Sequence, residues 1–83
     1  MEDLMSRLRP GQSGRVLKIL TGKDMRRRLL EIGLIKGSRI LCVGRSPLGG
    51  MGAYEIMGAV MALRDSDCEK IIIEREETDD EKI

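Results

Sequence analysis

The stretch MRRRLLEIGLIKGSRI, residues 25–40, decides the fold of this 83-residue chain. Its apolar residues recur at helical spacing, because at 100° per residue Met25, Leu29 and Ile32 fall within about 60° of one another. Gly33 follows directly and suits the position just beyond a helix end, where the left-handed backbone favours glycine. We therefore predict a short helix that buries this stripe and ends before Gly33.

The predicted helix spans residues 24–32, with Thr21 or Asp24 as its cap. This places three consecutive arginines, residues 26–28, near its start. Cations are disfavoured there by roughly 0.3–1 kcal/mol each, because of the exposed N–H groups and the helix dipole. Two interpretations remain open. Either the arginine stems lie along the protein surface while their charges pair with Glu31 or reach water, or the arginines form a basic surface for an acidic partner.

Short aliphatic runs separated by glycine and polar turns predict strands in the rest of the chain. Phe and Trp are absent and Tyr54 is the only aromatic residue, so aliphatic side chains must form the core. Residues 64–70 form a polar turn before the last strand. A mainly β fold follows, namely a small five-stranded β-barrel with one short α-helix after the first strand. The expected strands cover residues 13–20, 39–45, 54–57, 59–63 and 70–76.

Charge is segregated along the chain. Residues 1–48 hold eleven Lys or Arg and four Asp or Glu, a balance of +7, whereas residues 49–83 hold four and ten, a balance of −6; the net charge is +1. The two halves either pair within the fold or create a dipolar surface that orients a partner. The shortage of aromatic side chains argues against binding of single-stranded nucleic acids and of proline-rich peptides, since both rely on aromatic rings.

The sequence contains no catalytic or metal-binding motif. It has no histidine, and its two cysteines, Cys42 and Cys68, are too far apart for a zinc motif. Cys42 lies within a predicted strand, and we expect both thiols to be buried and structural. The GGMG run, residues 49–52, lacks the Gly-Lys-Ser/Thr of a phosphate loop and precedes a strand. We expect no enzymatic activity and no strong ferrous iron or zinc site.

The sequence gives no indication of secretion or membrane insertion. The N-terminus has no apolar signal segment. The longest mostly apolar run, residues 56–63, is far shorter than the ~20 residues that span a bilayer. We expect a cytoplasmic protein with one domain, residues 1–75, followed by an acidic, disordered tail, residues 76–83.

The chain resembles the FeoA family over residues 4–75. The most specific match is RRLLEIGLIKGSRI followed by Pro47, Leu48 and Gly49. The resemblance implies an SH3-like β-barrel, a fold shared with the C-terminal domain of repressors that resemble the diphtheria toxin repressor. This chain departs from the family in one turn, where GGMGA replaces the usual Gly-Asp-Pro. The segments that carry the resemblance are LRPGQSGRVLKI, RRRLLEIGLIKGSRI, SPLGG, GAVMALR and CEKIIIE.

The resemblance also implies a function. FeoA proteins are small cytosolic, non-enzymatic accessory proteins of ferrous iron transport, so this chain is expected to bind the cytosolic GTPase-bearing part of the FeoB permease. The permease would recruit it to the inner face of the membrane. Weak binding of ferrous iron or another transition metal is also implied. The alternative is a nucleic-acid-binding or metal-dependent regulatory SH3-like module, against which the acidic second half and the lack of aromatic residues count.

The residues expected to bind the partner combine positive charge with apolar surface. A basic face would orient an acidic partner and speed its association. Exposed apolar residues in the glycine-rich turn would supply an anchor beside that face. We expect no catalytic or cofactor-binding residue. The expected partner-binding residues are Arg27, Arg28, Lys36, Leu48 and Met51.

Overall fold

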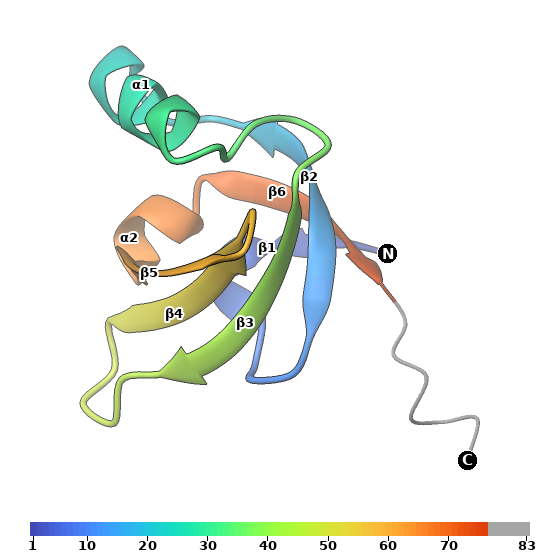
Figure 1. The fold of residues 1–83 in the computed structure, drawn as a ribbon, viewed down its shortest axis with the longest axis vertical. Helices are drawn as coiled ribbons and strands as arrows, with labels where there is room; N and C mark the ends of the chain where they lie inside the picture. Colours follow the sequence, from blue (N-terminus) through green and yellow to red (C-terminus); the bar gives the residue numbers. More distant parts are fainter. Residues whose placement is uncertain (77–83) are drawn as a thin grey trace.

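A computed structural model describes residues 1–76 of the chain. Six strands form one antiparallel sheet in the order β1-β6-β2-β3-β4-β5, and this sheet curls round on itself (Figure 1). The longer helix, α1, stands at one end of the sheet, on the connection between β2 and β3. In chain order the elements are β1 (Glu2–Leu4), the 3-10 turn η1 (Met5–Arg7), β2 (Ser13–Ile19), α1 (Lys23–Glu31), β3 (Arg39–Arg45), β4 (Met51–Ile56), β5 (Ala59–Arg64), α2 (Asp65–Cys68) and β6 (Ile71–Glu76).

The mainly β fold is confirmed, but the predicted number of strands is wrong by one. The five predicted strands are present, although β4 begins at Met51, three residues earlier than expected. The additional strand, β1, pairs with β6, with Glu2 opposite Glu74. β1 has only three residues, two of them charged, so it shows no alternating pattern and depends on its partner strand. At the other end of the chain, Glu76 belongs to β6, and the rest of the predicted tail, residues 77–83, lies outside the described residues.

Two short helical turns close the gap between the edges of the sheet. β1 and β5 are the edge strands and are not hydrogen-bonded to each other. η1 contacts α2, and α2 in turn contacts β5. Each turn buries one side chain, Met5 from η1 and Cys68 from α2. Side-chain packing therefore completes the barrel where strand pairing stops.

The core is aliphatic, as the composition requires, and Tyr54 is fully buried within it. The Tyr54 hydroxyl accepts a hydrogen bond from Arg45 Nη1 at 3.0 Å, and Arg45 Nη2 donates to Asp65 Oδ1 at 2.6 Å. These bonds link β3 to the start of α2. Gly52 leaves room for them, because a Cβ there would lie 2.8 Å from the Tyr54 hydroxyl oxygen.

Helix α1 buries the predicted stripe, since Leu29 is 1% exposed and Met25 and Ile32 pack against the core. The predicted caps, however, are wrong. The extended backbone that a cap requires falls at Gly22 (φ −68°, ψ 173°), which makes no side-chain cap hydrogen bond. The hydroxyl of Thr21 is buried without a hydrogen-bond partner among residues 1–76.

The arginines of α1 lie further from the helix start than the sequence indicates. The helix begins at Lys23, one residue early, and Asp24 occupies its first turn. Arg28 lies in the last turn, where a cation interacts favourably with the negative end of the helix dipole. The predicted conflict between the arginines and the dipole is therefore relieved at Arg28.

Hydrogen bonds fix the turn that follows α1. Gly33 adopts a positive φ of 89°, consistent with its predicted place beyond the helix end. Leu34 N donates to Leu29 O at 2.8 Å. Ser38 Oγ donates to Gly33 O at 2.9 Å and accepts from Ile35 N at 3.0 Å. The turn is thus held by a hydrogen bond to the helix and by Ser38, the residue just before β3.

The connection that carries α1 is closed at its base by β2. Gly37 N donates to Val16 O at 2.7 Å, and Val16 N donates to Ser38 O at 2.9 Å. The tip of the β4–β5 hairpin contacts the same connection. There, Met57 (φ 52°) and Gly58 (φ 82°) form a two-residue turn, and the Met57 side chain lies where a Cβ at position 33 would be.

Candidate docking surface

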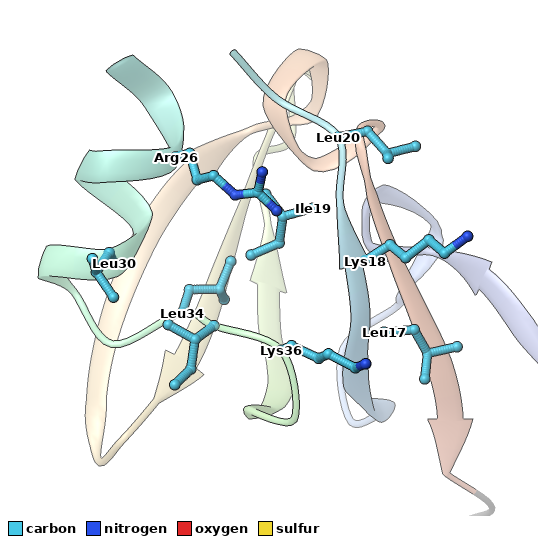
Figure 2. A pocket seen from close by; sticks show the side chains of 9 residues that line it. Leu17, Lys18, Ile19, Leu20, Arg26, Leu30, Leu34 and Lys36 are labelled. Atoms are coloured by element: carbon cyan, nitrogen blue, oxygen red, sulfur yellow. The ribbon is translucent and has the colours of Figure 1, made fainter. Parts of the chain in front are cut away.

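A groove of about 650 Å³ lies between α1 and β2. We call it the α1–β2 groove. Figure 2 shows that Arg26 extends from the helix toward β2, and that Lys36 extends toward the same strand from the turn after the helix. The groove is lined by Leu17, Lys18, Ile19, Leu20, Arg26, Leu30, Leu34, Ile35 and Lys36.

The groove has a buried floor and exposed apolar walls. Leu34 is 1% exposed and Ile19 8%, so both belong to the core. Leu30 of the helix and Leu20 at the end of β2 are 61% and 60% exposed, and Ile35 is also exposed. Large aliphatic side chains that gather around a concave surface are typical of a site that a partner covers.

The charged residues that line the groove are all cations. Lys18, Arg26 and Lys36 are exposed, and none of them has an ion pair or a side-chain hydrogen bond within residues 1–76. No Asp or Glu lines the groove. Positive charge therefore remains available to a ligand at this site.

Other cations of the basic half do pair within the fold. Glu76 Oε1 lies 2.8 Å from Arg39 Nε, and Glu76 Oε2 lies 3.4 Å from Arg15 Nε. Burial of Glu76 would raise its pKa, but hydrogen bonds from Ser13 and Arg39 outweigh this effect, and the pKa lies below its usual value. Together with the Arg45–Asp65 pair, these contacts show that internal pairing accounts for part of the charge segregation.

A second cavity, of about 390 Å³, lies on the other flank of the helix, and we call it the α1–β5 cavity. It brings together two of the predicted partner-binding residues, Arg28 and Met51. Its charges are mixed, because Asp67 lies there beside Arg28 and Arg64. The complete lining is Met25, Arg28, Leu29, Ile32, Met51, Ala62, Leu63, Arg64 and Asp67.

The structure therefore divides the predicted partner-binding residues among separate places. Lys36 lies in the α1–β2 groove, whereas Arg28 and Met51 lie in the α1–β5 cavity. Arg27 and Leu48 are exposed and line neither, and Leu48 is 97% exposed in the turn before β4. Arg26 is absent from the predicted set. Its place on one flank of the helix with Leu30, four residues later, is the sequence signal that identifies it.

A third cavity, of about 460 Å³, is rich in arginine, but several of these arginines form ion pairs within the fold. It is lined by residues of the N-terminal segment together with Arg45 and Arg75. Arg75 donates from Nε to Asp3 Oδ2 at 2.8 Å and from Nη1 to Gln12 Oε1 at 2.8 Å. The hydrogen bond from Arg75 lowers the pKa of Asp3. Through these hydrogen bonds, Arg75 holds the N-terminal segment against β6.

The two thiols are buried, as expected. Cys42 and Cys68 are both free and fully buried. Burial raises the pKa of Cys68 to about 12, so its thiol stays protonated at neutral pH and is a poor metal ligand. Within residues 1–76, no three His, Cys, Asp or Glu side chains gather in a way that could hold a metal ion. No helix among these residues has the length and apolar character to span a membrane.

The FeoA domain model matches residues 4–75, nearly the whole of the described structure. The chain belongs to the FeoA family. This confirms the resemblance carried by the segments between residues 4 and 75. No curated protein sequence matches the chain.

Solved FeoA structures have the same fold. FeoA from Chlorobium tepidum superimposes with a TM-score of 0.82 at 25% identity, covering 87% of this chain and 69% of that chain. FeoA from Stenotrophomonas maltophilia, solved in complex with zinc and described as a prokaryotic SH3 domain protein, has a TM-score of 0.72 at 26% identity, covering 89% and 95%. The chain is therefore an SH3-like protein of the family related to ferrous iron transport.

The same fold occurs in a regulatory protein. A manganese-dependent transcriptional repressor has a TM-score of 0.82 at 24% identity, and the match covers 90% of this chain but only 41% of the repressor. At this identity the likeness concerns the fold alone. It confirms the expectation that the FeoA barrel also forms one domain of metal-dependent repressors.

Proposed function

We propose that this FeoA protein is a non-enzymatic accessory protein of ferrous iron transport that binds the cytosolic GTPase-bearing part of the FeoB permease. The observation that carries the proposal is the α1–β2 groove, whose buried floor is lined by exposed aliphatic side chains and by three cations that have no ion pair within residues 1–76. Such a surface binds a partner by shape, apolar contact and charge. Membership of the FeoA family supports ferrous iron transport as the process involved.

The proposal places the protein in the cytoplasm and at the inner face of the membrane only while it is bound to the permease. A basic surface suits this role, because complementary charge accelerates association and orients the encounter. In this proposal the protein changes the behaviour of its partner by binding and performs no chemistry of its own. The buried, protonated Cys68 thiol and the complete lack of histidine support that view.

The α1–β5 cavity and its surroundings supply a second contact in the same proposal. Arg28 and Met51 lie together there, and Arg27 and Leu48 extend the exposed surface around them. Because both sites flank one helix, a partner that covers α1 reaches the groove on one side and the cavity on the other. Lys36 then belongs to the first contact and Arg28 to the second.

Association kinetics with the reconstituted permease test this function. We expect wild-type protein to bind FeoB in lipid nanodiscs faster at low salt than at high salt, since the Debye length falls from about 30 Å at 0.01 M to about 10 Å at 0.1 M. Replacing Arg27 and Arg28 by glutamate should slow association most at low salt. A complete lack of binding to the permease would refute the proposed function.

The fold shared with the manganese-dependent repressor favours one second candidate, a nucleic-acid-binding or regulatory module. The basic surface around α1 is compatible with phosphate contacts, whereas the acidic second half of the chain opposes them. A filter-binding titration against duplex DNA and RNA distinguishes the two functions. Because electrostatic binding is strongest at low salt, no retention at about 50 mM salt would exclude this candidate.

A further inference from the structure

We infer that the α1–β2 groove receives an acidic segment of its protein partner, with one branched aliphatic side chain inserted between α1 and β2 and with carboxylates placed against Lys18, Arg26 and Lys36. This inference rests on the proposed function for the identity of the partner. Beyond the proposed function, it specifies which side chains the partner segment carries.

The shape of the groove indicates the inserted side chain. Its floor consists of core residues, Ile19 and Leu34, while Leu20 and Leu30 are exposed. A single aliphatic side chain placed between α1 and β2 would contact apolar atoms on several sides and would remove Leu30 from water, whereas Leu20 points away from the helix at the outer edge of the groove (Figure 2). Because Leu30 is 61% exposed, a partner can bury more apolar surface there than on the core residues of the floor.

The charges indicate the flanking carboxylates. Every charged side chain that lines the groove is a cation, and these cations come from three parts of the fold: Lys18 from β2, Arg26 from α1 and Lys36 from the turn. Figure 2 shows Arg26 and Lys36 extending across the groove toward β2, while Lys18 extends from β2 on the side away from the helix, so cations flank this strand on both sides. By contrast, the α1–β5 cavity already contains Asp67 beside its arginines. Charge complementarity thus selects an acidic ligand for the groove alone.

Concavity favours a protein segment over a lipid surface. A membrane presents a broad surface of headgroups, which would touch the exposed Leu20 and Leu30 but would not fill the groove between α1 and β2. An inserted side chain fills it. Aliphatic residues beside lysine and arginine also occur on membrane-binding surfaces, so the test includes anionic lipid as a separate ligand.

Matched substitutions test the inference with FeoB permease in nanodiscs. We expect Arg26→Glu to weaken binding about tenfold or more, whereas Arg9→Glu, the same charge change on an exposed arginine before β2, changes it less than about twofold. Leu30→Ser should weaken binding similarly, whereas Val60→Ser, on a side chain of nearly equal exposure (62%) in β5, should not. Circular dichroism verifies that each variant is folded. If the groove variants bind as their controls do while wild-type protein binds the permease, the inference is wrong and the proposed function stands.

Synthetic peptides test whether the groove binds an acidic, leucine-containing segment when the permease is absent. A short glutamate-rich peptide with two central leucines should shift the amide NMR signals of the groove residues in the full chain. The same peptide with serine in place of leucine, or lysine in place of glutamate, should not. Shifts confined to other residues, or no shifts, would overturn the inference even if the permease binds. Groove-dependent binding to empty nanodiscs that contain anionic lipid would overturn it in favour of a membrane surface.

Discussion

At the scale of single residues, Gly33 combines two requirements that no other residue type meets. Its φ is 89°, and the Met57 side chain occupies the place of a Cβ. We expect Gly33→Ala to lower the free energy of unfolding by about 1–2 kcal/mol from the backbone alone, and more if Met57 is displaced. Gly44→Ala is the matched control, because it has open space around it and no positive φ; its effect should stay within about 1 kcal/mol in either direction. Denaturant unfolding measures both, and equal effects would contradict the prediction.

Cys68 permits a second prediction at this scale. Its pKa is raised from 9.0 to about 12 by burial, so its folded-state thiolate fraction at neutral pH is on the order of a thousandfold smaller than that of an unfolded thiol. We expect alkylation of Cys68 by iodoacetamide at pH 8 to be very slow in the native protein and fast in urea, as followed by mass spectrometry. The raised pKa also sets how Cys68 affects stability at different pH. Its contribution to the free energy of unfolding is fully present below pH 9 and is lost as the pH rises toward 12. Rapid native alkylation would show that the thiol is accessible.

At the scale of secondary structure, helix α1 depends on one buried face. Leu29 is 1% exposed, whereas its neighbour Leu30 is 61% exposed. Leu29→Ala should lower the free energy of unfolding by roughly 2–5 kcal/mol, because it leaves a cavity in the core. Leu30→Ala should stay within about 0.5 kcal/mol, as for most exposed positions. Denaturant unfolding with a fixed m-value separates the two, and similar losses would mean that α1 buries a different face.

The same helix shows what sequence reasoning can predict at this scale. The periodicity of Met25, Leu29 and Ile32 is local, so it predicted both the helix and its buried face. The cap at Gly22 could not be predicted, because the connection from β2 determines which residue is extended. β1 was missed for a related reason, since its strand conformation comes from pairing with β6 and not from its own three residues.

At the scale of the whole molecule, the basic half of the sequence separates into paired and unpaired cations. Arg15, Arg39 and Arg45 pair with acids of the second half, whereas Arg26 and Lys36 have no ion pair among residues 1–76. The sequence predicted an excess of charge around the helix, but it could not show which cations the fold neutralises. The groove was missed because only the tertiary arrangement of α1 and β2 brings Leu30 and Ile19 to one concave surface.

Metal binding depends on which ligands the whole chain can bring together. The chain has no histidine, and its two thiols are buried and free. We expect anaerobic calorimetry of the full chain with Fe²⁺ to show no stoichiometric site tighter than about 1 μM, which corresponds to about −8 kcal/mol. Zn²⁺ should behave in the same way. A tighter stoichiometric site would contradict this prediction.

The hydrogen bonds between Val16 and the backbone of Gly37 and Ser38 have an evolutionary consequence. They close the base of the connection that carries α1, and β2 and β3 remain paired beneath it. The exposed side chains of residues 21–36 can therefore be exchanged without altering the register of any strand. Only the small set of side chains that faces the core, led by Leu29 and Leu34, restricts such changes. Changes of partner can accordingly arise at exposed positions of α1 such as Arg26 and Leu30, while Leu29, Gly33 and Leu34 keep the barrel stable.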